Sequence, residues 1–128
     1  MEIIYADEDL VVCVKPARVL STDEPGGVPE LLRQALGTDD VRTVHRLDRV
    51  VGGVMVFSRD KRFTGKLTAQ VAEHKVKKEY LAVLTGVPEQ EEAELRDLLF
   101  RDSSKNKTYV VQRARKGVRE AIDRKSVV

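Results

Sequence analysis

The stretch HRLDRVVGGVMVFS, residues 45–58, joins a charged turn to an apolar strand and decides how the middle of the chain folds. Its second half, Gly53–Ser58, is dense in β-branched and aromatic side chains and predicts a β-strand. Residues 41–47 predict a preceding strand, which runs into a polar turn at Asp48 and Arg49. The pattern therefore places one carboxylate, that of Asp48, on a turn between two strands.

The residues before this stretch predict two short strands and a helix. Strands are expected at 3–5 and 10–14, and Lys15-Pro16 ends the second because proline lacks the N–H that a ladder needs. Polar residues and a Pro-Gly-Gly cluster predict a loop at 21–27. A helix follows over 28–36, and Gly37 stops it.

The residues after the stretch predict a second helix and further strands. A helix is expected over 60–74, with Phe63, Leu67 and Val71 on one face. Residues 89–100 fit either helix or strand. Strands are expected at 78–85, 108–111 and 121–128. The fold class is therefore α+β, a mixed and mainly antiparallel sheet with a few flanking helices, in one domain spanning residues 1–128.

Composition narrows the class of protein. A chain of 128 residues with 41% hydrophobic and 34% charged residues is typical of a globular domain. Its apolar runs are too short to cross a membrane, and its acidic N-terminus is unlike a targeting peptide, so the cytoplasm is the expected compartment. The single cysteine, Cys13, cannot form an internal disulfide, and no Cys/His cluster predicts a metal site.

Charge is distributed unevenly along the chain. Residues 1–40 carry 3 Lys/Arg and 9 Asp/Glu, whereas residues 41–128 carry 20 Lys/Arg and 12 Asp/Glu. A basic surface suits a polyanion because neutralised phosphates release counterions. Scattered, solvated Lys/Arg side chains would give the same count, so charge permits a nucleic-acid partner without establishing one.

Asp48 is the residue to which the pattern assigns chemistry. A carboxylate on a turn held between two strands is a common layout for a reactive group. Arg46, two residues earlier, can favour the ionised form that a nucleophile needs. The bland alternative is that Asp48 is an ordinary turn residue and that Gly52-Gly53 is ordinary turn chemistry.

Several motifs together resemble one family. HRLD followed by Gly-Gly and an apolar strand resembles the signature of RluA-type pseudouridine synthases, and the family's strand-opening glycine falls on Gly53. Strand 10–14 with Lys15-Pro16 resembles the family's N-terminal motif, and Lys78-Glu79-Tyr80 resembles its Lys-x-Tyr strand. His45 stands where the related RsuA-type enzymes usually have glycine.

The resemblance implies an enzyme that isomerises uridine to pseudouridine in ribosomal or transfer RNA, without cofactor or metal. It implies that Asp48 is the nucleophile, that Arg46 helps to flip the base and that Tyr80 stacks on the uracil. It gives His45, Leu47, Gly53 and Lys78 orienting or structural roles. Lys15 and Pro16 are expected to be architectural as well, with a phosphate contact as the alternative for Lys15.

The chain departs from the family in two places. Val51-Gly52 stands where the family usually has Thr-Ser, so a loop hydrogen bond is expected to be lost. The family's C-terminal Gly-Arg-x-His-Gln-Ile-Arg motif does not occur in residues 1–128, so the sequence is interpreted as the N-terminal portion of the catalytic domain and as inactive alone. An exposed strand edge near 121–128 would favour a homodimer.

Two alternatives remain beside the RNA-modifying enzyme. One is an RNA-binding fragment of the same fold that cannot turn over. The other is a small-molecule enzyme that uses Asp48 and His45 as an acid–base pair.

Overall fold

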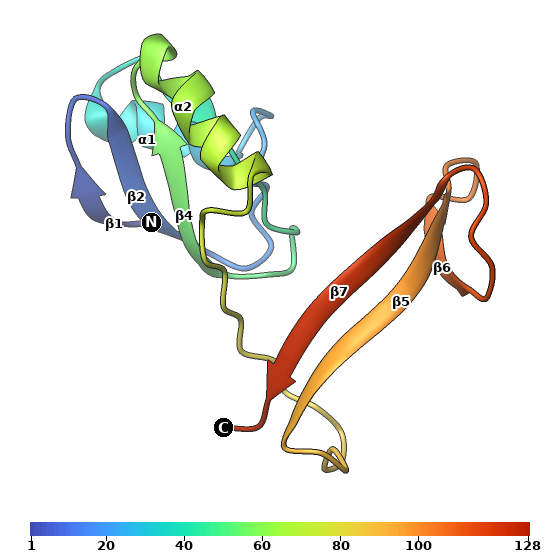
Figure 1. Cartoon of the computed structure of the whole chain (residues 1–128). Coiled ribbons are helices and arrows are strands. Elements are labelled where there is room, and N and C mark those ends of the chain that lie inside the picture. Colours follow the sequence, from blue (N-terminus) through green and yellow to red (C-terminus); the bar gives the residue numbers. More distant parts are fainter. The chain divides into compact units, whose positions relative to one another are not determined.

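A four-stranded antiparallel sheet organises the first part of the chain in the computed structural model, which describes residues 1–128 (Figure 1). Its order is β1-β2-β4-β3, with β1 at Glu2–Ala6, β2 at Leu10–Lys15, β3 at Arg42–Thr43 and β4 at Gly53–Ser58. The predicted strands at 3–5, 10–14 and 53–58 are confirmed.

One face of this sheet carries the core. Side chains alternate between the two faces of a strand. Val11 and Cys13 of β2 therefore share a face with Met55 and Phe57 of β4, and all four are buried. Helix α1, Val28–Leu36, covers this face with Val28 and Leu32, and Val41 completes the cluster. The core is thus assembled within the first 58 residues.

Both predicted helices form. Helix α1 has the predicted bounds and ends at Gly37, whose φ of 63° is the left-handed conformation that glycine adopts without strain. Helix α2, Lys61–Ala72, begins after Asp60, whose side chain accepts a hydrogen bond from the Arg62 N–H. Neither helix has the length and apolar character needed to cross a bilayer.

The second part of the chain forms a separate sheet. The chain divides into two compact units, Met1–Glu79 and Tyr80–Val128. The second unit contains β5 (Glu92–Asp102), β6 (Lys107–Val111) and β7 (Val118–Ser126), antiparallel in the order β6-β5-β7. It has no buried residue. The α+β class with antiparallel strands is confirmed, and the ambiguous segment 89–100 lies largely in β5.

Two strand predictions need correction. Residues 78–85 form no strand. The segment pairs with no other strand, and the side chains of Leu81 and Val83 are almost fully exposed. An extended segment without a partner has no ladder to stabilise it. The strand predicted at 41–47 is reduced to Arg42–Thr43, since the His45 side chain takes the next hydrogen bond to β4.

Candidate active site

The loop between β3 and β4 presents Asp48 at a tight turn. The Asp48 carbonyl accepts a hydrogen bond from the Val51 N–H at 3.0 Å, so Asp48 is the first residue of a β-turn. Aspartate is favoured at this position. The local sequence therefore forms the turn that was predicted between the two strands.

Side chains alternate along the residues that enter this turn. Leu47 is half-buried and packs against the core, whereas Arg46 and Asp48 on either side of it are exposed. Neither charged side chain forms a hydrogen bond or an ion pair with another residue of the chain. The Asp48 carboxylate is thus open to solvent on a backbone that Leu47 anchors. The pairing of Arg46 with Asp48 and the roles given to both residues stay predictions.

The backbone after Asp48 is held by the loop that follows β2. The Arg49 carbonyl accepts hydrogen bonds from the Arg18 N–H at 2.6 Å and from the Lys15 Nζ at 3.3 Å. The Arg49 Nε in turn donates to the Arg18 carbonyl at 3.1 Å. Arg18 has a φ of 71°, an uncommon conformation for a residue other than glycine.

Lys15 is a buried cation with an internal role. Its side chain is 0% exposed, and its Nζ donates to the carbonyls of Pro16 (3.0 Å) and Val19 (2.7 Å) as well as Arg49. Burial lowers the pKa of this ammonium group. All three of its N–H donors are used within the chain, which favours an architectural role over the phosphate contact considered as the alternative.

His45 joins the loop to the central strand. Its Nε2 accepts a hydrogen bond from the Val56 N–H at 3.1 Å, in place of the backbone carbonyl that a longer β3 would supply. A ring nitrogen that accepts carries no proton, so this bond requires neutral imidazole at that nitrogen. Burial, and secondarily the charge of Lys78, lowers the pKa of His45. The bond ties His45 to the sheet.

Two glycines allow the loop to approach the end of β2. A Cβ on Gly52 would lie 3.3 Å from the Ala17 nitrogen and 3.4 Å from the Lys15 carbonyl oxygen, tighter than ordinary contacts. Gly53 has a φ of 151° and pairs with Lys15 at the start of β4. The close approach keeps the Asp48 loop against the segment that binds Arg49.

The remaining predicted site residues lie away from this turn in the sequence. Tyr80, the first residue of the second unit, is 62% exposed in an extended segment, and Lys78 is exposed at the end of the first unit. Pro16 is exposed, and its carbonyl accepts from Lys15. The stacking role of Tyr80 stays a prediction.

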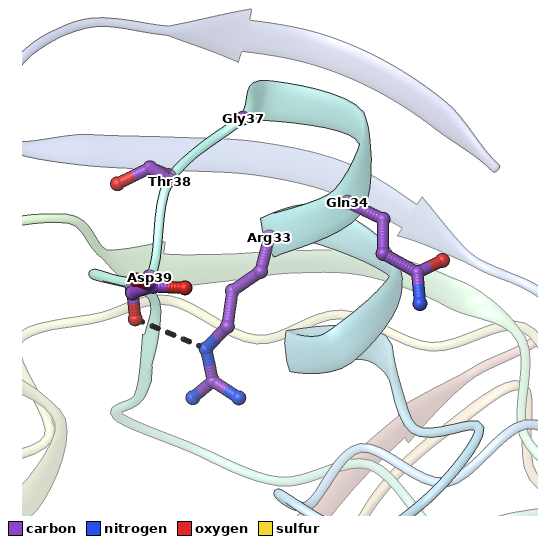
Figure 2. A pocket seen from close by; sticks show the side chains of 5 residues that line it. All are labelled: Arg33, Gln34, Gly37, Thr38 and Asp39. Atoms are coloured by element: carbon purple, nitrogen blue, oxygen red, sulfur yellow. Dashed lines mark hydrogen bonds between the residues drawn. The ribbon is translucent and has the colours of Figure 1, made fainter.

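One hollow of the first unit is not lined by Asp48. A depression of about 320 Å³ lies at the end of α1, lined by Arg33, Gln34, Gly37, Thr38 and Asp39 (Figure 2). The Arg33 Nε donates to the Asp39 carbonyl at 3.2 Å, and its other nitrogens bind Asp23 and the Val41 carbonyl. Its one cation, Arg33, is thus already bound within the chain.

Sequence reasoning missed Ser21. This residue is 3% exposed; its Oγ donates to the Leu47 carbonyl at 2.8 Å and accepts from the Leu47 N–H at 3.3 Å. The two residues are 26 positions apart, so no local periodicity links them. The sequence predicts only a polar loop at Ser21, and a polar loop gives no sign that this residue is buried.

Comparison with known proteins identifies the class to which this fold and loop belong. The family model for RNA pseudouridylate synthases matches residues 9–128. The chain is 36% identical over 97 residues to tRNA pseudouridine synthase C of Vibrio parahaemolyticus, covering 71% of this chain and 39% of that protein. It is 29% identical over 119 residues to ribosomal large subunit pseudouridine synthase C of Buchnera aphidicola, covering 90% of the chain and 38% of that protein.

Solved structures show the same fold. The human protein RNA pseudouridylate synthase domain containing 1 superposes with a TM-score of 0.77 at 20% identity, covering 94% of this chain and 49% of that one. Domain containing 4, also human, gives a TM-score of 0.74 at 22% identity, covering 94% and 51%.

The chain belongs to the RNA pseudouridylate synthase family, and the resemblance to its RluA-type members is confirmed. It spans about two fifths of the length of these two bacterial relatives.

Proposed function

We propose that the protein isomerises uridine to pseudouridine in RNA and that Asp48 is its nucleophile. The observation that carries the proposal is the Asp48 carboxylate, which is exposed and forms no hydrogen bond or ion pair. The residues on either side of it, Leu47 and Arg49, are both hydrogen-bonded to the loop after β2. A reactive group needs this combination of an open side chain and a fixed backbone.

The proposed chemistry uses only the substrate and the carboxylate. Uridine leaves its stack to enter the site, as bases that undergo chemistry must. Asp48 bonds covalently to the nucleoside, the N1–C1′ bond breaks, and the uracil rotates before C5 bonds to C1′. The C5 proton is lost, N1 gains a proton and Asp48 is released, so the reaction is an isomerisation. Arg46 would help to flip the base and Tyr80 would stack on it.

The proposed substrate is transfer or ribosomal RNA, by analogy with the names of the two bacterial relatives. Charge in the second unit supports a polyanionic partner. Residues 101–119 hold seven basic side chains and one acidic one, and none of the seven forms an ion pair. At the other end of the same sheet, Arg96 and Arg124 are paired with Glu94. Cations that form no internal ion pair are available to phosphates.

The direct test is turnover and trapping. The 128-residue chain and the complete translation product of its gene are each incubated with tRNA and rRNA, and pseudouridine is measured by mass spectrometry. RNA containing 5-fluorouridine is used to trap the covalent adduct. We expect product and adduct with at least one protein, and neither with the Asp48→Asn variant.

The matched control is Asp97→Asn, which removes an exposed carboxylate of β5 that has no side-chain partner. It should leave turnover unchanged. Turnover by Asp48→Asn at the wild-type rate would overturn the assignment of the nucleophile. RNA binding without product or adduct from either protein would instead support the RNA-binding fragment.

A second test concerns the RNA contact. Replacing Lys105, Arg113 and Lys116 by Gln should weaken RNA binding. It should also reduce the slope of log affinity against log salt concentration by about one for each lost cation. The control exchanges the paired Arg96 and Arg124 for Gln, which should weaken binding less. Equal losses in the two variants would contradict the assignment of this surface.

A further inference from the structure

We propose that Ser21 is a positioning residue for Asp48. The inference rests on the proposed function, because it assumes that Asp48 reacts. Its basis is a pair of reciprocal hydrogen bonds: the Ser21 hydroxyl donates to the Leu47 carbonyl at 2.8 Å and accepts from the Leu47 N–H at 3.3 Å. One side chain thus satisfies both backbone groups of the residue that precedes the nucleophile.

Ser21 is itself firmly held. It is 3% exposed, and its carbonyl accepts from the Thr43 Oγ1 at 3.5 Å. The carbonyl of its neighbour Leu20 accepts from the N–H of Val28, the first residue of α1 and part of the core. The hydroxyl that binds Leu47 is therefore connected to both β3 and α1.

The two sides of Asp48 are held by one segment. Ser21 binds Leu47 on the N-terminal side, while Lys15 and Arg18 bind the carbonyl of Arg49 on the C-terminal side. These residues lie within 15–21, from the last residue of β2 into the segment before α1. Removing the Ser21 hydroxyl releases only the N-terminal side, so the loop should stay folded while the carboxylate gains freedom.

Serine suits this place chemically. A hydroxyl is both donor and acceptor, which the N–H and C=O of Leu47 together require. Alanine would leave both groups without a partner at a site closed to water. Small displacements of a reacting group lower rates steeply, by about a hundredfold for 1 Å.

The test compares Ser21→Ala with Ser58→Ala. Ser58 is a matched control because it is 0% exposed and its Oγ also makes two hydrogen bonds, to the Asp60 carbonyl and the Thr64 Oγ1. It lies at the end of β4 opposite Gly53. Both variants should lower the melting temperature similarly. Only Ser21→Ala should lower kcat, by about tenfold to a hundredfold, with little change in KM.

Three outcomes are informative. Equal kcat losses in Ser21→Ala and Ser58→Ala would reduce Ser21 to a structural residue and overturn the inference. Turnover by Asp48→Asn in the same assay would instead overturn the proposed function. A readout independent of turnover is hydrogen exchange of the Leu47 amide in the 128-residue chain, which should accelerate in Ser21→Ala and stay unchanged in Ser58→Ala; unchanged exchange in Ser21→Ala would also refute the inference.

Discussion

The two units of this chain obtain their structure by different means. Met1–Glu79 buries side chains from two strands and a helix in one cluster. Tyr80–Val128 has longer strands but no buried residue, and leaves Leu95, Val110 and Ile122 about half exposed or more. The second unit is held by its backbone ladders and by exposed ion pairs, and each such ion pair is worth about 0–1 kcal/mol. Strand length therefore does not indicate stability, because burial supplies most of it.

The largest difference between the units should follow from removing one phenylalanine in each. Phe57 is 0% exposed, so Phe57→Ala should cost the first unit about 3–5 kcal/mol. Phe100 in β5 is half-buried, so Phe100→Ala should cost the second unit less than about 2 kcal/mol. Native-state hydrogen exchange of β2 and β4 amides, against those of β5 and β7, measures the two losses separately. Equal losses would refute the contrast.

A smaller difference is expected for two lysines that bind carbonyls. Lys15→Met removes the buried Nζ donor from the carbonyls of Pro16, Val19 and Arg49 and should cost about 1–3 kcal/mol. Lys125→Met removes one donor from the exposed Gln90 carbonyl and should change stability by only about 0.5 kcal/mol. Urea denaturation of each variant provides the comparison. A loss for Lys125→Met as large as that for Lys15→Met would contradict it.

Acid should weaken the first unit through His45. The folded chain holds the pKa of His45 below its ordinary value of 6.5, mainly by burial. Above pH 6.5 the His45 imidazole is neutral in both the folded and the unfolded chain, so it takes nothing from the free energy of unfolding. As the pH falls, the unfolded chain takes up the proton first, so stability declines through the folded pKa. His45→Asn should flatten this decline between pH 7 and 5 in thermal unfolding, whereas His74→Asn, on an exposed residue, should not.

The smallest effect concerns backbone strain. Arg18→Gly should stabilise the first unit by about 0.5 kcal/mol, since relief of a left-handed conformation exceeds the added freedom of the unfolded glycine. In the second unit Asn106 has a φ of 49°, a conformation that asparagine tolerates, so Asn106→Gly should bring no gain. A gain at Asn106 matching that at Arg18 would show that residue type does not decide the strain.

Local patterns predicted the first unit well. The bounds of α1 and β4 follow from an apolar stripe closed by Gly37 and from a β-branched run opened by Gly53. The strand predicted at 78–85 failed because β-propensity says nothing about whether a partner is present. The strand predicted at 41–47 is shorter than expected because the His45 side chain, in place of a backbone carbonyl, accepts the hydrogen bond from the Val56 N–H.

The candidate site was predictable only in part. The turn at Asp48 could be derived from its neighbours, and the resemblance to a family gave it a role. Its supports could not be derived, because the Ser21–Leu47 and Arg18–Arg49 bonds join residues 26 and 31 positions apart. Such contacts depend on how β2, α1 and β4 pack, which short-range patterns do not specify.

The segment 15–21 limits where this chain can change length during evolution. An extra residue within it would shift the Ser21 hydroxyl relative to the Lys15 ammonium, and both cannot then reach the same loop. The exposed turn at Ser103–Lys105, between β5 and β6, forms hydrogen bonds only with residues at most three positions away. Insertions should therefore be tolerated at that hairpin turn and selected against between β2 and α1.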